Sequence, residues 1–217
     1  MCRRANEFSA AFIGGEAPSI KRRRALVNGA ALVIAADSGL VSAEKAGITP
    51  DFIVGDMDSL SETGEIERLL RYPPQKIIRF LKDKDYSDTE LALRHLLSAG
   101  ANRVRLIGGG NGRLDHTLAI NNLVKKEKRI ESWHTKNEDV YAIDAPSVFG
   151  LDARAGTVVS VFKAGSGPWK AESKGLKWPL NELCWEETGF FSLSNSVLND
   201  GFAIYAQKGR FMAVVNI

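Results

Sequence analysis

Residues 76–110, KIIRFLKDKDYSDTELALRHLLSAGANRVRLIGGG, hold the pattern that decides the fold: an apolar strand, a helix and a second apolar strand. The helix is expected over residues 89–97, because leucines recur there at roughly helical spacing. Ser87 and Glu90 stand three residues apart, as in a capping box, and Gly100 stands where helices commonly end on glycine. The segment therefore predicts a strand–helix–strand unit.

The same alternation extends to both sides of this unit. The expected strands are residues 10–13, 32–36, 52–54, 76–80 and 104–107, and the expected helices are residues 20–27, 40–46, 65–70, 89–97 and 114–126. Strands that alternate with helices favour a doubly wound, mostly parallel sheet with helices on both faces. We therefore expect an α/β domain over residues 1–144, with ligands beyond the carboxyl ends of its strands.

The final third of the chain has a different pattern. Residues 157–163, 189–193, 202–207 and 211–215 are typical of short strands, and clusters of Gly, Pro, Asn and Ser separate them. We expect a smaller all-β sandwich over residues 145–217. Its small size suggests that the first domain or a partner chain helps it to stay folded.

The composition is that of an ordinary globular protein. Hydrophobic residues make up 44% of the 217 positions and charged residues 25%, which argues against disorder. The formal net charge of +3 is mild. The densest basic run, residues 21–24, is interpreted as the solvated face of the first helix, so we expect no nucleic-acid partner.

Cysteines and apolar runs bear on the expected compartment. Cys2 and Cys184 are the only cysteines, so we expect neither a zinc site of the usual spacing nor a disulfide framework. The longest apolar stretch, residues 30–36, is too short to cross a bilayer, and no signal-peptide pattern is present. We therefore expect a cytoplasmic protein without a membrane partner.

Carboxylates gather after the expected strands. Asp56 and Asp58 have an i, i+2 spacing, which in extended backbone directs both side chains to one side. Further carboxylates near strand ends are Asp37, Asp83, Asp85 and Asp88. Clustered like charges repel unless a cation neutralises them, and Mg²⁺ takes one or two carboxylates together with water and phosphate oxygens. The sequence predicts a magnesium site here, with turn formation or helix-dipole stabilisation as the alternative for individual residues.

A glycine run, Gly108-Gly109-Gly110-Asn111-Gly112, lies between an expected strand and an expected helix. Such a run presents open backbone N–H groups to a phosphate, and Gly14 with Gly15 follows the first strand in the same way. The run matches neither a Walker A loop nor a dinucleotide fingerprint, since Arg113 stands where the third glycine of that fingerprint belongs. Arg113 is suited to bidentate phosphate binding, and Asp115 either holds this arginine or contacts metal or substrate. The alternative for the run is a tight turn.

Taken in order, these segments resemble the thiamine pyrophosphokinase (thiamine diphosphokinase) family. The matching segments are Asp37-Ser38-Gly39, Gly55-Asp56-Met57-Asp58-Ser59, Asp83-Lys84-Asp85-Tyr86-Ser87-Asp88, Gly112-Arg113-Leu114-Asp115-His116, Gly175-Leu176-Lys177-Trp178-Pro179-Leu180 and Ser192-Leu193-Ser194-Asn195. The resemblance extends from about Ala10 to the C-terminus. One departure is Ser87, where the family usually carries threonine, and there the hydroxyl is retained.

The resemblance implies an α/β nucleotide domain, a C-terminal β-sandwich, and a homodimer that binds thiamine where the subunits meet. It implies magnesium-associated positions at Asp56, Asp58 and Asp88, and further polar active-site positions at Asp37, Arg113 and Asp115. It also implies that Trp178, Ser192, Ser194 and Asn195 belong to segments that line the thiamine pocket.

The implied activity is Mg²⁺-dependent transfer of the pyrophosphoryl group of ATP to the hydroxyl of thiamine, giving thiamine diphosphate and AMP. Arg113 is expected to oppose charge on the transferring group, and Asp37 or Asp85 to accept the hydroxyl proton. Trp178 is expected either to stack on the cationic thiamine ring or to pack in a core or interface. The alternatives are a diphosphokinase acting on a pterin alcohol and a non-catalytic sensor of nucleotide or thiamine.

Overall fold

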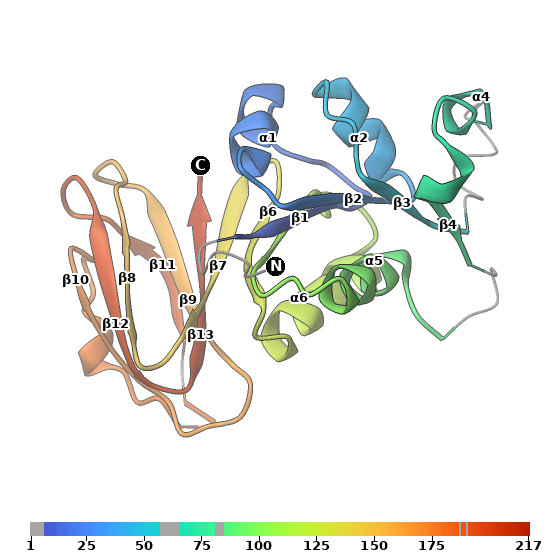
Figure 1. Ribbon diagram of the computed structural model, residues 1–217. Helices are drawn as coiled ribbons and strands as arrows, with labels where there is room; N and C mark the ends of the chain where they lie inside the picture. The colour runs from blue at the N-terminus through green and yellow to red at the C-terminus, as the bar shows by residue number, and fades with distance from the viewer. Residues whose placement is uncertain (1–6, 57–65, 81–84, 187, 190) are drawn as a thin grey trace. The chain divides into compact units, whose positions relative to one another are not determined.

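The computed structural model describes residues 7–56, 66–80, 85–186, 188–189 and 191–217 (Figure 1). The chain divides into two compact units, Met1–Ile120 with Trp133–Lys136 and Asn121–Ser132 with Asn137–Ile217. None of the described helices combines the length and the apolar character that a membrane span requires.

The first unit is built on a parallel sheet. Its strands are β1 (Ser9–Phe12), β2 (Leu32–Ala36), β3 (Phe52–Gly55), β4 (Ile77–Arg79) and β5 (Val104–Ile107). They pair in the order β5-β1-β2-β3-β4, all parallel, and β6 (Ile130–His134) follows β5. The chain moves outward from β1 to β4 and returns to β5 on the other side of β1. The carboxyl ends of β1 and β5 therefore form the point where the strand order reverses, the usual ligand position in such sheets.

Helices cover both faces of this sheet, as expected for a doubly wound fold (Figure 1). One face carries α1 (Ile20–Val27) and α2 (Gly39–Lys45), and the opposite face carries α5 (Asp88–Ser98) and the start of α6 (Leu114–Lys126). The short α4 (Ile66–Leu69) and a 3-10 turn, η1 (Pro74–Lys76), lie between β3 and β4. The predicted fold class is confirmed.

The predicted cap of α5 is confirmed atom by atom. The Glu90 amide donates to Ser87 Oγ at 3.3 Å, and the Ser87 amide donates to Glu90 Oε2 at 2.9 Å. Leucines at the expected spacing, Leu91, Leu93 and Leu96, are buried. The cap fixes where α5 begins, and thus where Asp88, its first residue, lies.

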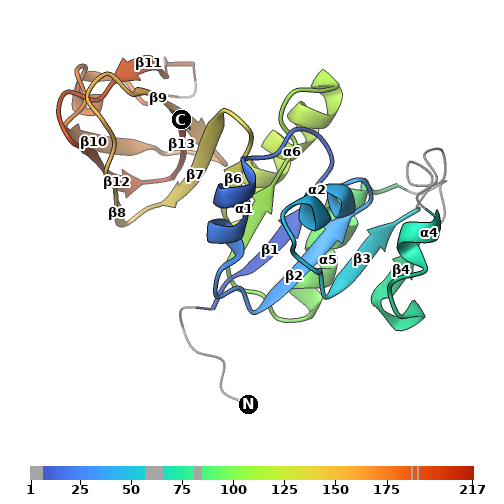
Figure 2. The same ribbon diagram turned by 90° about the horizontal axis from the view of Figure 1, so that it is seen from above.

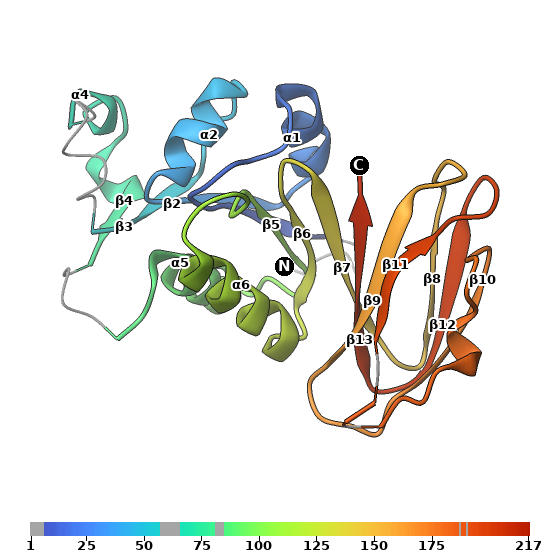
Figure 3. The ribbon, with the colours of Figure 1, turned by 180° about the vertical axis from the view of Figure 1, so that it is seen from behind.

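The second unit is a sandwich of antiparallel strands (Figure 3). The strands are β7 (Glu138–Asp144), β8 (Ser147–Leu151), β9 (Val158–Ala164), β10 (Lys170–Lys174), β11 (Ser192–Ser196), β12 (Phe202–Lys208) and β13 (Arg210–Asn216), with a 3-10 turn, η2 (Leu180–Glu182). One sheet has the order β11-β9-β13-β7 and the other β10-β12-β8. Buried side chains of both sheets, including Val161, Ile204 and Phe211, share one core.

Two sequence expectations in this unit need correction. The strand expected at residues 189–193 is displaced, because β11 runs from Ser192 to Ser196. The strands β7, β8 and β10 were not expected at all. In β10, Ala171 is the only buried residue, and most of β8 is exposed, so neither has the alternating apolar pattern that reveals a strand in a sequence.

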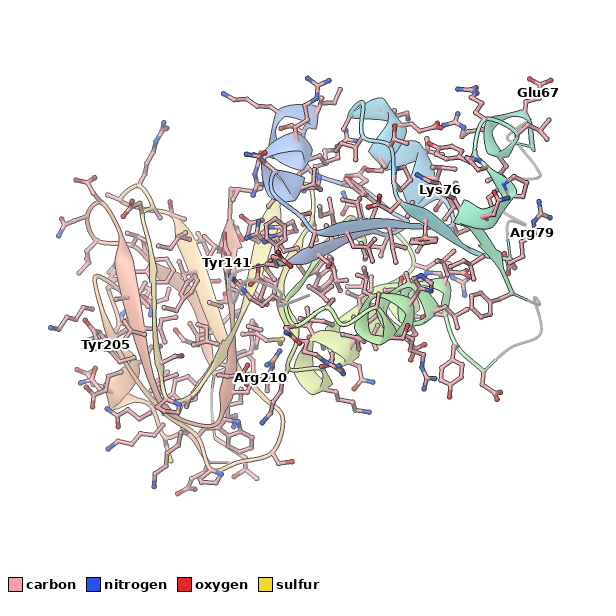
Figure 4. The ribbon with its side chains drawn as sticks, viewed as in Figure 1. Glu67, Lys76, Arg79, Tyr141, Tyr205 and Arg210 are labelled. Atoms are coloured by element: carbon pink, nitrogen blue, oxygen red, sulfur yellow. The ribbon has the colours of Figure 1, made fainter. Side chains whose placement is uncertain are left out.

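A buried arginine, Arg210 (labelled in Figure 4), stabilises the second unit. Its Nη2 donates to the carbonyl oxygens of Val124, Glu127 and Ile130, each at 3.0 Å. Its Nη1 forms an ion pair with Asp144. These bonds compensate the removal of the guanidinium from water and hold the C-terminal turn of α6.

Candidate active site

Two glycine loops meet where the strand order of the first unit reverses. The amide of Gly109 donates to the carbonyl of Gly14 at 2.7 Å, and Glu16 and Gly110 exchange backbone bonds of 2.7 and 3.1 Å. A Cβ added at Gly15 would lie 2.9 Å from the carbonyl oxygen of Gly110, and φ at Gly15 is +91°. Only glycine fits this approach without strain.

These contacts change how the glycine run is interpreted. The amides of Gly108, Gly109 and Gly110 donate to the carbonyls of His134, Gly14 and Glu16. The prediction that the run presents open N–H groups to a phosphate is therefore wrong for these three glycines. The neighbouring loop and β6 occupy the donors, a contact that no local pattern reveals. Gly112, by contrast, is exposed and has no other atom within 4 Å of an added Cβ.

Carboxylates from separate segments gather around Gly55, the last residue of β3. A Cβ added there would lie 3.3 Å from the Cβ of Asp37 and 3.3 Å from Oδ1 of Asp88. Asp37 follows β2 in a left-handed conformation (φ +46°), and its amide donates to the carbonyl of Val54 at 2.9 Å. The structure thus brings Asp37 and Asp88 together at the edge where Asp56 follows directly in the chain.

The other carboxylates predicted for this site are not shown to join the group around Gly55. Asp58 and Asp83 lie outside the described residues, and Asp85 is exposed. Among the residues that the structure describes, no three His, Cys, Asp or Glu side chains form a metal-holding group. A Mg²⁺ ion needs only one or two carboxylates when water and phosphate complete its shell. Asp88, with Asp56 directly after Gly55, fits that requirement, and Asp37 lies on the other side of Gly55.

Arg113 and Asp115 form a bidentate ion pair at the start of α6. Nη2 of Arg113 lies 2.6 Å from Oδ2 of Asp115, and Nε lies 3.2 Å from Oδ1. The hydrogen bond from Arg113 lowers the pKa of the Asp115 carboxyl, and the same bond raises the pKa of Arg113. Of the two roles considered for Asp115, holding the arginine is the one observed. Both side chains remain accessible, at 75% and 60% exposure, so the guanidinium is free to meet a ligand.

Glu16 is a residue that the sequence did not single out. Its Oε2 accepts from Lys136 Nζ at 3.1 Å and from Asn111 Nδ2 at 3.0 Å. These bonds, that from Lys136 first, lower the pKa of Glu16. The carboxylate thereby ties the loop after β1 to the glycine run and to residue 136. No sequence signal links these three positions.

A second network that the sequence did not reveal connects α2 with α4. Glu44 Oε2 pairs with Arg68 Nη1 at 2.6 Å, and Glu44 Oε1 accepts from the Tyr72 hydroxyl at 3.0 Å. Burial, with the Glu44 hydrogen bond second, raises the pKa of Tyr72 to about 12. The partners are 24 and 28 residues apart in sequence, beyond the reach of any local motif.

The basic run of residues 21–24 is not simply a solvated face. Arg23 is half-buried, and its Nη1 donates to the carbonyl and, at 3.2 Å, to Oγ of Ser42. Arg24 Nε donates to the carbonyl of Ala46 at 2.7 Å. The solvated interpretation is wrong for Arg23, because α2 packs beside α1 and offers it acceptors, whereas Arg24 is exposed although it also bonds to Ala46. Lys21 is exposed, as expected.

In the second unit, Asn195 holds the segment that carries Trp178. Asn195 is fully buried. Its Oδ1 accepts from the Trp178 amide at 3.1 Å, and its Nδ2 donates to the Trp178 carbonyl at 2.6 Å and to Ser192 Oγ at 3.1 Å. Asn195, itself bonded to the buried Ser192, therefore holds the backbone of Trp178 in place, and the Trp178 side chain points outward.

Trp178 is 54% exposed, and Lys177 Nζ lies 4.7 Å from the centroid of its ring. The outward Ser194 has φ +54°, and its amide donates to Ser160 Oγ at 3.0 Å. An indole fixed by its backbone and open to solvent offers a flat apolar face for a ligand or a partner chain. Of the residues that the resemblance places in the thiamine-lining segments, Trp178 is thus the one whose ring is open to a ligand.

Residues 23–133 match the family "Thiamin pyrophosphokinase, catalytic domain". This span includes Asp37, Gly55, Asp88 and the Arg113–Asp115 pair. No curated protein matches the sequence.

Solved structures of similar fold cover nearly the whole chain. Thiamine pyrophosphokinase from Bacillus subtilis has a TM-score of 0.77 at 20% identity, covering 96% of this chain and 98% of that one. Thiamin pyrophosphokinase from Geobacillus thermodenitrificans has a TM-score of 0.74 at 21% identity, covering 97% and 98%. Thiamin pyrophosphokinase from Candida albicans has a TM-score of 0.73 at 16% identity, covering 96% and 89%. At these identities the likeness establishes the fold.

Proposed function

This chain belongs to the thiamin pyrophosphokinase family, and we propose that it transfers the pyrophosphoryl group of ATP to the hydroxyl of thiamine, forming thiamine diphosphate and AMP. The single observation that carries the proposal is the meeting of Asp37 and Asp88 at Gly55. Acidic side chains that approach one backbone position from two segments favour a bound cation, and an ATP-dependent transfer requires one.

Asp56, Asp58 and Asp88 are proposed to hold Mg²⁺. Mg²⁺ supplies charge neutralisation and orientation of the phosphates. The carboxylates fix where the triphosphate lies, and Gly55 keeps the centre of the cluster free of a side chain. Gly14, Gly15, Gly108, Gly109, Gly110 and Gly112 are proposed to border the nucleotide by leaving room for its close approach, rather than through the amides already used within the protein.

In the proposed reaction, the thiamine hydroxyl oxygen forms a bond to the β-phosphorus. The bond from that phosphorus to the oxygen bridging the α-phosphorus breaks, and its electron pair leaves with AMP. Asp37 or Asp85 accepts the hydroxyl proton. Arg113 opposes the charge on the transferring group, held in place by Asp115. Arginine residues in this role contribute about 10³–10⁵ in rate, or roughly 4–7 kcal/mol.

The two parts of the chain are assigned different substrates. The α/β part, expected over residues 1–144, is proposed to bind ATP. The β part, expected over residues 145–217, is proposed to bind thiamine and to form a homodimer with thiamine bound where two subunits meet. Trp178 would stack on the cationic ring, an arrangement suited to an indole face. The proposed setting is the cytoplasm.

The test is an incubation of purified protein with ATP, Mg²⁺ and thiamine, with AMP and thiamine diphosphate measured together. We expect equimolar products, and none when Mg²⁺ is omitted. Replacing thiamine by a pterin alcohol tests the other acceptor class. Nucleotide binding without any AMP release would instead identify a non-catalytic sensor and refute the proposal.

A further inference from the structure

A cavity of about 340 Å³ lies beside α1 and α2 in the first unit. Figure 2 shows these two helices side by side over β1 and β2. The lining residues are Gly15, Arg23, Ser38, Val41, Ser42 and Lys45. Two cations and two hydroxyls thus surround a space of the size that holds a small ligand.

The two cations of this cavity have no counterion within the described part of the chain. Arg23 Nε is shielded from solvent and has no hydrogen-bond partner among the described residues, while Nη1 donates to Ser42. Burial lowers the pKa of Arg23, yet a guanidinium stays protonated at neutral pH. Glu44, the acid next to Lys45 in sequence, is engaged by Arg68 and Tyr72. The cavity therefore carries uncompensated positive charge.

Ser38 connects this cavity with the acidic cluster. It directly follows Asp37, and a Cβ added at Gly14 would lie 2.7 Å from Ser38 Oγ. The cavity thus begins at the carboxyl ends of β1 and β2, next to the carboxylates around Gly55. Arginine, lysine and hydroxyl donors together are the usual partners of phosphate oxygens. A phosphate bound in this cavity would therefore lie next to any phosphate held at the acidic cluster around Gly55.

We infer that this cavity binds the phosphate of the AMP unit, which is the α-phosphate of bound ATP and the phosphate of the departing AMP. The assignment rests on the proposed function for its substrate. The acidic cluster with its cation, together with Arg113, is assigned to the β- and γ-phosphates, so the cations of this cavity are left for the α-phosphate. When the bond between the β-phosphorus and the bridging oxygen breaks, that oxygen keeps the electron pair and the AMP phosphate gains negative charge. Arg23 and Lys45 then oppose more charge in the product than in ATP, so they favour the transfer.

The test measures binding of AMP and of adenosine by calorimetry, in buffer containing Mg²⁺ and no thiamine. Lys45→Gln removes one cation from the cavity, and Lys45 is exposed, so the fold should be retained. Arg23→Lys keeps the charge and removes the planar donor group. The matched control is Lys21→Gln, which removes the same charge from an exposed position on α1 that does not line the cavity. Thermal unfolding of each variant confirms that it is folded.

We expect Lys45→Gln and Arg23→Lys to weaken AMP binding by about tenfold, the loss of one charged hydrogen bond, and to leave adenosine binding unchanged. Lys21→Gln should bind AMP as the unchanged protein does. Normal AMP affinity in both cavity variants would overturn the inference. Equal weakening of AMP and adenosine, or an equal loss in Lys21→Gln, would also overturn it, because neither result is specific to a phosphate in this cavity.

The binding test can be separated from the test of the proposed function. If no thiamine diphosphate forms but AMP binding depends on Lys45, the phosphate site stands and the proposed reaction falls. If thiamine diphosphate forms at a normal rate and both Lys45→Gln and Arg23→Lys bind AMP normally, the reaction stands and the phosphate site falls.

Discussion

Replacing Gly55 by alanine is the sharpest perturbation of the candidate active site. The added methyl group would lie 3.3 Å from both the Cβ of Asp37 and Oδ1 of Asp88, tighter than most real Cβ contacts. The backbone at Gly55 has φ +154°, where an L-residue costs about 1–3 kcal/mol. Asp37 and Asp88 must therefore move apart by a few tenths of an ångström or more. Misplacement of about 1 Å at a reacting centre costs roughly 100-fold in rate.

Gly55→Ala is expected to lower kcat for AMP release by up to about 100-fold, the cost of a full 1 Å misplacement, and to raise the Mg²⁺ concentration needed for half-maximal rate. Its melting temperature should fall by roughly 2–4 °C for each kcal/mol of strain. The matched control is Gly29→Ala, where φ is +79° and an added Cβ meets nothing within 4 Å. That variant should lose stability from the backbone alone and keep the Mg²⁺ response. Wild-type kcat and Mg²⁺ dependence in Gly55→Ala would refute the reasoning that the carboxylates converge on a cation.

The remaining predictions concern charged and buried groups. Arg113→Ala should lower kcat by about 10³–10⁵ with little change in melting temperature, because the side chain is 75% exposed; an unfolded variant would contradict this. In the same variant the pKa of Asp115, held low by Arg113, should rise toward the ordinary value of about 3.9, as followed by NMR titration. The pKa of Tyr72 is raised to about 12 in the folded protein, whereas an ordinary tyrosine has a pKa of about 10. The neutral Tyr72 hydroxyl therefore contributes its full share to the free energy of unfolding below about pH 10, and this share is lost as pH rises toward 12. Glu44→Gln should lower the pKa of Tyr72 only in part, because burial is the larger cause of the raised value. An ultraviolet titration that shows no change in this pKa would argue against the hydrogen bond to Glu44. Asn195→Ala removes a buried amide with four hydrogen bonds, so urea unfolding should show a loss of about 1–3 kcal/mol, and KM for thiamine should rise more than kcat falls.

The sequence predicted the local elements of the first unit with good accuracy. The helices Ile20–Val27 and Leu114–Lys126 and the strands Leu32–Ala36 and Val104–Ile107 have the predicted bounds. The capping box at Ser87 and Glu90 is also as predicted. These features depend on the spacing of apolar residues, on capping residues and on glycine positions, and each of these signals lies within a few residues of the element that it defines.

The sequence was less informative where polar strands and polar contacts decide the structure. The strand Lys170–Lys174 has one buried residue, and the partners of Arg23 lie on another helix, 19 residues away. The open N–H groups expected at Gly108, Gly109 and Gly110 are used by neighbouring carbonyls. In each case the determining partner is remote in sequence, so a local pattern contains no record of it.

By itself, the order of residues determined an alternating α/β unit, a following β unit, and a set of carboxylates and glycines at strand ends. Tertiary structure alone decided which of these groups meet: Asp37 and Asp88 at Gly55, Asp115 on Arg113, and Arg23 with Lys45 around one cavity. The physical reason is that secondary structure follows from short-range backbone and side-chain preferences. The surroundings of a charged group, in contrast, are set by which distant segments the core brings side by side.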